Sequence, residues 1–130
     1  MKEQLETISK LISFTHNMNL LYVEDNEDIR NSTMIFLEDL FGNITIAVNG
    51  EDALNKFCTD KFDLIITDGS MPKLDGFGLS KAVRQQDSKI PILMIAALDT
   101  AATNKDITAF ISKPIDAEEF IHTLFKIVKK

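Results

Sequence analysis

Five short apolar runs, separated by amphipathic stretches, constrain the fold of this chain more than any other feature. They cover residues 20–23, 44–48, 62–67, 90–97 and 107–112. Sequences that are mostly apolar, as these are, are typical of strands buried on both faces, and such strands form parallel sheets. The stretches between the runs carry apolar residues at helical spacing. The alternation predicts an α/β fold, in which helices cover both faces of a doubly wound five-stranded parallel sheet.

Four helices are predicted after strands, at residues 27–41, 51–58, 76–86 and 116–129. Asp25 or Asn26 can cap the first of them, and Asp75 can cap the third. The connection at 98–106 has few large apolar residues and fits two helical turns at most, so we expect a shortened or irregular helix there.

An additional helix is predicted ahead of the first strand, at residues 2–15, because its apolar residues recur at helical spacing. This helix either packs on the domain or is the tail of an upstream segment. We therefore divide the chain into an N-terminal amphipathic extension (1–18) and one α/β domain (19–130). The last predicted helix ends with the chain, so we expect a stand-alone protein or a part of a longer one.

The composition excludes several classes of function. The net charge of −6 argues against direct binding to nucleic acid or to anionic membranes, which needs a basic surface. The longest apolar run is too short to span a bilayer. Cys58 is the single cysteine, so no intrachain disulfide can form, and we expect this thiol to be buried. We expect a cytoplasmic protein.

Charged residues follow three of the predicted strands. Glu24 and Asp25 follow the first, Asp68 ends the third, and Lys113 follows the fifth. The carboxyl ends of parallel strands meet at one edge of the sheet, where functional groups gather. Three crowded carboxylates are costly unless a cation relieves them, and a magnesium-type site is the natural relief. A carboxylate beside Mg²⁺ and a lysine is also equipped to accept a phosphoryl group.

Each of these residues also has a structural interpretation. Asp25 could serve only as a helix cap. Asp68 could be a loop aspartate that accepts hydrogen bonds from backbone amides. Lys113 could be an ordinary surface lysine. A flavin-binding flavodoxin is a poor alternative, because the loop after the first strand, residues 24–28, is acidic and would repel a phosphate.

Three motifs give the chain a family resemblance: the acidic pair Glu24-Asp25, the stretch Asp68-Gly69-Ser70-Met71-Pro72-Lys73-Leu74-Asp75-Gly76, and Phe110-Ile111-Ser112-Lys113-Pro114. With these motifs the chain resembles the receiver domain of bacterial two-component response regulators over about residues 19 to 130. The resemblance implies a flavodoxin-like fold with strand order 2-1-3-4-5. It also implies a Lys113–Pro114 bond that is often cis.

The resemblance assigns roles by position. Asp68 would be the phosphoacceptor and Lys113 the contact to the phosphoryl group. Mg²⁺ would be bound by Asp25, Asp68 and the backbone carbonyl of Ser70, with Glu24 acting through water. Phe110 would be the aromatic switch residue.

The family's partners also follow from the resemblance. The phosphoryl group would come from a histidine of a kinase or a phosphotransfer protein, and the signal would pass to a downstream protein target or output domain. The chain would be a signalling phosphoacceptor, which catalyses only its own phosphorylation and dephosphorylation.

One position departs from the family pattern. Receivers usually carry Thr or Ser at the end of the fourth strand, where this chain has Ala96. A hydroxyl there would donate a hydrogen bond to the phosphoryl group, and Ala96 has none. The segment from Ala96 to Lys113 is also shorter than usual. An alternative function is therefore a degenerate receiver, which acts as a protein-interaction module without a phosphorylation switch.

Overall fold

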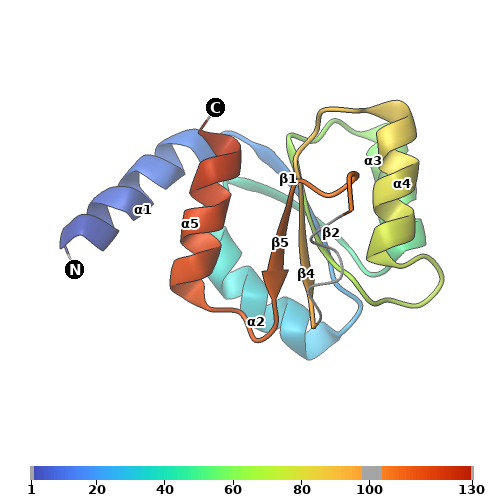
Figure 1. Cartoon of the computed structure of the whole chain (residues 1–130), viewed down its shortest axis with the longest axis horizontal. Helices are drawn as coiled ribbons and strands as arrows, with labels where there is room; N and C mark the ends of the chain where they lie inside the picture. Colours follow the sequence, from blue (N-terminus) through green and yellow to red (C-terminus); the bar gives the residue numbers. More distant parts are fainter. Residues whose placement is uncertain (1, 98–103, 130) are drawn as a thin grey trace.

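The computed structural model describes residues 2–97 and 104–129 of the chain. Its centre is a parallel sheet with strand order β2-β1-β3-β4-β5 (Figure 1). The strands are β1 (Asn19–Val23), β2 (Asn43–Ala47), β3 (Leu64–Asp68), β4 (Ile92–Ala96) and β5 (Ala109–Ser112). The predicted fold class and strand order are confirmed, and each strand lies within about two residues of its predicted position.

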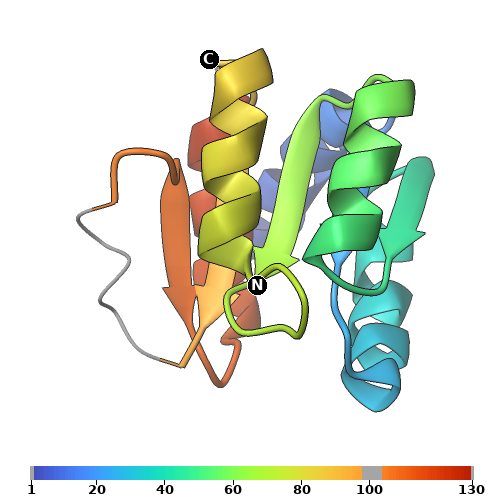
Figure 2. The same cartoon turned by 90° about the vertical axis from the view of Figure 1, so that its right-hand side faces the viewer.

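Helices cover both faces of the sheet (Figure 2). They are α1 (Lys2–Thr15), α2 (Glu27–Glu38), α3 (Gly50–Thr59), α4 (Gly76–Gln86) and α5 (Ala117–Val128). Alternate residues of the buried strands point to opposite faces, so the core has two parts. Leu20 and Ile66 pack with α1, α2 and α5, whereas Leu21 and Ile65 pack with α3 and α4.

Side-chain caps start the helices that follow strands. Asn26 Oδ1 accepts the Ile29 N–H at the start of α2, at 2.9 Å. Asp75 Oδ1 accepts the Gly78 N–H at the start of α4, at 2.8 Å, as predicted. Since Asn26 is the cap of α2, Asp25 is not needed for that role.

The N-terminal helix α1 packs on the domain. Leu11 is fully buried in the core part shared by α2 and α5, and Thr15 Oγ1 donates a hydrogen bond to the Leu40 carbonyl. The ring of Phe14 meets Phe125 of α5 edge to face, with centroids 6.0 Å apart. Of the two sequence interpretations of this helix, the structure supports packing. The division of the chain at residue 18 stays a prediction.

The connection between β4 and β5 is partly described. Residues 98–103, where most of the shortened helix was predicted, lie outside the described residues, and 104–108 form a turn instead of a helix. Arg84 of α4 holds this turn, since its Nε donates to the Asp106 carbonyl at 3.0 Å and its Nη2 to Thr108 Oγ1 at 3.3 Å.

Two further expectations concern single features. Cys58 is exposed, with its sulfur beside the amide of Gln86, so the prediction of a buried thiol is wrong. The thiol lies at the outer end of α3, where the last turn leaves the core. Across the described part of the chain, every helix is too short or too polar to cross a membrane.

Candidate functional site

The sheet register brings the predicted site residues to one edge. Val23, the last residue of β1, pairs with Thr67, and Asp68 of β3 pairs with Ile95 of β4. At the next pairing, Ala96 of β4 lies opposite Ser112 of β5. Glu24, Asp25, Asp68 and Lys113 therefore leave the sheet at the same end, as the topology of parallel strands requires.

Three carboxylates form a cluster at this edge. Oxygen atoms of Glu24, Asp25 and Asp68 all lie within 4.8 Å of one another. Glu24 and Asp68 are 4% and 5% exposed, whereas Asp25 is open to solvent. A set of carboxylate oxygens with one open side is the chemistry that Mg²⁺ prefers, because this ion retains several waters. The cluster fits such an ion.

Asp68 is paired with Lys113. Its Oδ1 lies 2.7 Å from Lys113 Nζ. Within the described residues, no other donor reaches this buried oxygen, and the ammonium itself is not well aligned for a hydrogen bond. Asp68 is the last residue of β3, and within the described residues no backbone amide donates to Oδ1. Its carboxylate keeps lone pairs that an incoming group can use.

Burial and charge shift the pKa values of the neighbours of Asp68. Burial raises the pKa of the Glu24 carboxyl above its ordinary value, and the charge of Asp68 adds to this rise, although the Asn26 N–H opposes it. Burial alone would lower the pKa of Lys113, but Asp68, Glu24 and Asp25 outweigh this effect and raise it. Lys113 is therefore a fixed cation at neutral pH.

The loop from Gly69 to Asp75 is held tightly against the site. Gly69 N donates to Ile95 O at 3.0 Å, and Gly76 N donates to Gly69 O at 3.1 Å. A Cβ on Gly76 would lie 2.3 Å from the Asp68 carbonyl oxygen, so only glycine fits there. Lys73 has φ of 70°, an uncommon conformation for a residue with a side chain. Ser70, the predicted carbonyl ligand, is an exposed residue of this loop.

The two predicted switch positions lie on neighbouring strands. Ala96 ends β4, and its Cβ would be 2.9 Å from a Cβ on Gly69, so its side chain faces the loop that follows Asp68. It provides no hydroxyl at this place. Phe110 is partly buried on β5 and pairs with Met94. Lys113 follows a few residues later, and its bond to Pro114 is cis, as the resemblance implied.

Two residues that shape the site were not predicted for this role. Asn26 N donates to Glu24 Oε2 at 3.1 Å, and Arg30 Nη1 donates to the Glu24 carbonyl at 2.8 Å. Both contacts hold Glu24 in place just before α2. Their sequence signal is the spacing of Asn26 and Arg30 after Glu24, but it can be interpreted only once α2 is known to start at Glu27.

The fold and this acidic edge define a class of protein, the flavodoxin-like domains that carry a carboxylate cluster after β1 and β3 and a lysine after β5. The chain matches the response regulator receiver domain family over residues 20–125 and belongs to that family.

Curated relatives include a probable transcriptional regulator ycf27 of Cyanidium caldarium, 36% identical over 117 residues, which cover 86% of this chain and 47% of the relative. The alkaline phosphatase synthesis transcriptional regulatory protein PhoP of Bacillus subtilis is 42% identical over 83 residues, which cover 64% of this chain and 35% of that protein. The chain thus spans about half or less of the length of these two regulators.

Solved receiver structures have the same fold. Response regulator TrrA of Thermotoga maritima, solved in complex with Mg²⁺-BeF, aligns with a TM-score of 0.77 and 25% identity, over 85% of this chain and 98% of its own. Chemotaxis response regulator CheY4 of Vibrio cholerae aligns with a TM-score of 0.75 and 30% identity, over 85% and 98%.

Proposed function

We propose that this chain is a phosphoacceptor receiver module, which accepts a phosphoryl group from a histidine of a kinase or phosphotransfer protein onto Asp68. The observation that carries the proposal is the burial of the Asp68 carboxylate and its few contacts. It is buried at the carboxyl edge of the sheet, lies 2.7 Å from the Lys113 ammonium, and has no other hydrogen-bond donor on Oδ1 within the described chain. Such a carboxylate is positioned and available as a nucleophile.

The residues around Asp68 have complementary roles in this proposal. Asp25, Asp68, the carbonyl of Ser70 and, through water, Glu24 would hold Mg²⁺, which offsets negative charge on the transferred phosphoryl oxygens. Lys113 would contact the same oxygens. Its raised pKa keeps it protonated, so it remains a counter-charge throughout transfer. Gly76 lets the loop lie close to the Asp68 carbonyl, and Gly69 lets it lie against the side chain of Ala96.

The proposal predicts a metal-dependent covalent product. Intact mass measured after incubation with acetyl phosphate and MgCl₂ at pH 7 should show one added phosphoryl group. The Asp68→Asn variant should show none, and neither should the wild-type chain in EDTA. Equal addition to Asp68→Asn, or no addition to the wild type, contradicts the proposal. Asp75→Asn is a matched control at a capping aspartate, and it should be phosphorylated normally.

The same site supports a second function, a receiver that acts as a protein-interaction module without a switch. The observation that favours it is Ala96, which presents a methyl group toward Gly69 where a hydroxyl would report the phosphoryl group. The two functions differ in whether β4 and β5 change conformation when a phosphoryl analogue binds. If Mg²⁺ and beryllofluoride bind without shifting amide signals of β4 and β5, the interaction module is the better description.

A further inference from the structure

A cavity lies between α1, α2 and α5, and one end of it is lined by the first turn of α5. Its volume is about 560 Å³. Helices α1 and α5 touch at Phe14 and Phe125, and they diverge toward their N-termini (Figure 1). The space between the diverging halves is the cavity, which we call the α1–α5 groove. It is lined by Glu3, Thr7, Ile8, Phe36, Ala117, Glu118, Ile121 and His122.

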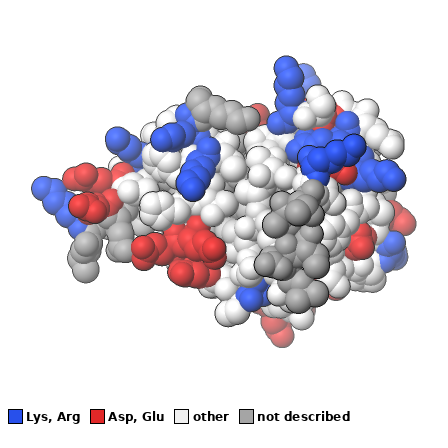
Figure 3. Space-filling view, viewed as in Figure 1, with Lys and Arg blue, Asp and Glu red and all other residues white. Residues whose placement is uncertain are grey.

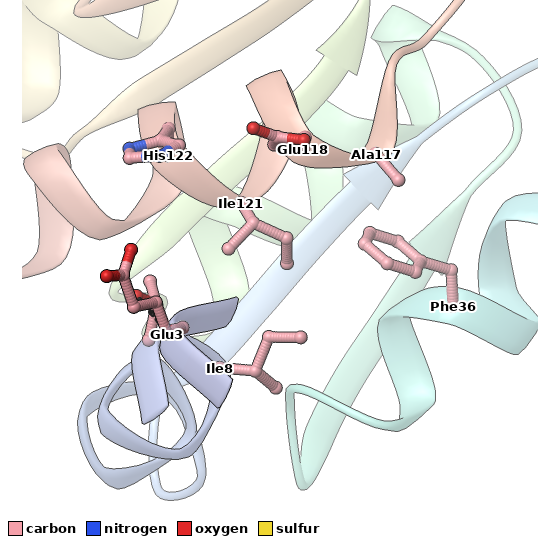
Figure 4. A pocket seen from close by; sticks show the side chains of 8 residues that line it. Glu3, Ile8, Phe36, Ala117, Glu118, Ile121 and His122 are labelled. Carbon is pink, nitrogen blue, oxygen red and sulfur yellow. Dashed lines mark hydrogen bonds between the residues drawn. The ribbon is translucent and has the colours of Figure 1, made fainter. Parts of the chain in front are cut away.

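The floor of the groove is apolar. Ile8 of α1, Phe36 of α2 and Ile121 of α5 point into the same space, as Figure 4 shows. Beneath them, the ring of Phe36 packs edge to face on the buried Phe120, with centroids 5.3 Å apart. The floor is therefore anchored to the main core, and the groove is a built part of the fold with room for several side chains.

The rim of the groove is acidic. Glu3 lines it from α1 and Glu118 from α5, and a smaller cavity that shares Glu3 and Thr7 adds Glu6 and Lys10. Figure 3 shows acidic atoms over the start of α5 and over the outer part of α1, on both sides of this region. A groove with an apolar floor and an acidic rim favours an occupant that is apolar on one face and basic beside it.

We propose that the α1–α5 groove binds a basic amphipathic helix of a partner protein. The helix would insert apolar side chains between Ile8 and Ile121 and place Lys or Arg beside Glu3 and Glu118. This is the helix-in-groove mode of recognition. It needs no phosphoryl group, so it stands apart from the function proposed for Asp68.

A second copy of this chain fits the groove poorly. Among the described helices, none exposes an apolar face flanked only by basic residues. Helix α1 carries Lys2 and Lys10 but also Glu3 and Glu6, and the start of α2 is acidic. The net charge of −6 also makes two copies repel each other. A basic partner helix would complement both the acidic rim of the groove and the negative net charge of the chain.

The test uses the full chain and a fluorescein-labelled peptide of about 18 residues, enough for five helical turns. The peptide carries Leu along one helical face and Lys elsewhere, and a scrambled peptide of the same composition lacks that face. We expect saturable binding of the amphipathic peptide by fluorescence anisotropy. Amide signals of Thr7, Ile8, Phe36 and Ile121 should shift in the ¹⁵N-labelled chain. Equal binding of the scrambled peptide, or shifts confined to other surfaces, overturns the proposal.

Two matched pairs of variants locate the site. Thr7→Trp fills the groove and should abolish binding, whereas Thr59→Trp, which loses the same kind of bond to its own helix, should not. Glu3→Lys with Glu118→Lys should weaken binding about tenfold, because attraction becomes repulsion at the rim. Glu51→Lys with Asp60→Lys makes the same charge change at the two ends of α3 and should have little effect.

The variants also show whether a partner helix or a second copy of this chain binds in the groove. If Thr7→Trp binds as tightly as Thr59→Trp, the groove is not the site. Sedimentation of the unliganded wild-type chain should show a monomer. A dimer that Thr7→Trp dissociates would assign the groove to a second copy and overturn the partner helix.

Discussion

Asp68 Oδ1 lies 2.7 Å from Lys113 Nζ, although the two residues come from strands that are not neighbours. Strand β4 separates β3 from β5, and the Lys113 N–H donates to the carbonyl of Ala96 at the end of β4, at 2.8 Å. The ion pair therefore depends on the correct pairing of three strands. It is also the one basic contact of the buried Asp68 within the described chain.

Replacing Lys113 by Met should destabilise the chain. The substitution leaves Asp68 buried beside Glu24 and Asp25 without a counter-charge, and an unpartnered buried acceptor costs about 1–3 kcal/mol. Urea denaturation at pH 7 without Mg²⁺ measures this cost. In the Asp68→Asn background the same change should cost much less, since the neutral amide does not need the ammonium. An equal loss of unfolding free energy in both backgrounds would mean that the Asp68–Lys113 ion pair contributes nothing to stability.

Glu24 should make the stability of the metal-free chain depend on pH. Its folded pKa is raised, so the folded state binds the proton more tightly than the unfolded state does. The stabilisation is complete below its ordinary pKa and is lost as the pH rises through the folded value. Glu24→Gln should therefore melt at a higher temperature than wild type at pH 7, and the difference should shrink near pH 4. A lower melting temperature at pH 7 would contradict this sign.

Restoring a hydroxyl at position 96 should strengthen binding of a phosphoryl analogue. A hydrogen bond to a charged group contributes about 1.5–3 kcal/mol, so Ala96→Thr should bind beryllofluoride with Mg²⁺ roughly tenfold or more tightly. Fluorine NMR titration measures the affinity. Ala97→Thr, one residue outside the strand, is the control and should leave the affinity unchanged. No gain at position 96 would show that its side chain does not reach the site.

Arg84 should stabilise the turn that precedes β5. Its guanidinium donates to the carbonyls of Asp106 and Asp87 and to Thr108 Oγ1. Arg84→Met should lower the free energy of unfolding by about 1–2 kcal/mol, given the usual net value of such bonds. It should also speed amide exchange at Ile107 and Thr108. Lys81→Met on the exposed side of α4 is the control. Unchanged exchange would refute the role of Arg84.

The N-terminal helix should belong to the cooperative folding unit. Leu11 is fully buried, so Leu11→Ala should cost about 2–4 kcal/mol, whereas Leu5, which is 61% exposed, should cost little when changed to Ala. A single thermal unfolding transition, monitored by circular dichroism, should shift for Leu11→Ala alone. A separate early transition of α1 would contradict its integration into the core.

The fold could be predicted because its signals are local. The runs at 20–23 and 44–48 and the capping residue Asp75 identify strands and a helix start without tertiary information. The meeting of Glu24, Asp25, Asp68 and Lys113 at one edge could also be predicted, because parallel strands bring their carboxyl ends together. The cap at Asn26 was the harder choice, since Asp25 is an equally good capping residue by type. Only the position of the first helical turn decides between them.

Other features depend on packing that the sequence does not reveal. Cys58 is on an amphipathic helix, but it lies at the end that leaves the core. The guanidinium of Arg84 holds the turn before β5 through hydrogen bonds to Asp106 and Thr108. A single arginine in the sequence does not predict these bonds. The α1–α5 groove exists because α1 diverges from α5 beyond Phe14, and the angle between two helices cannot be read from their apolar spacing.

The identity of the phosphorylated residue tests the central claim most directly. An aspartyl phosphate formed with acetyl phosphate and MgCl₂ can be reduced with borohydride to homoserine, which marks the modified position in peptide mass spectra. We predict homoserine at Asp68 in the wild-type chain and none in a sample treated with EDTA. Homoserine at Asp25 or Asp75 instead of Asp68, or none at any position, would contradict the assignment of Asp68 as the phosphoacceptor.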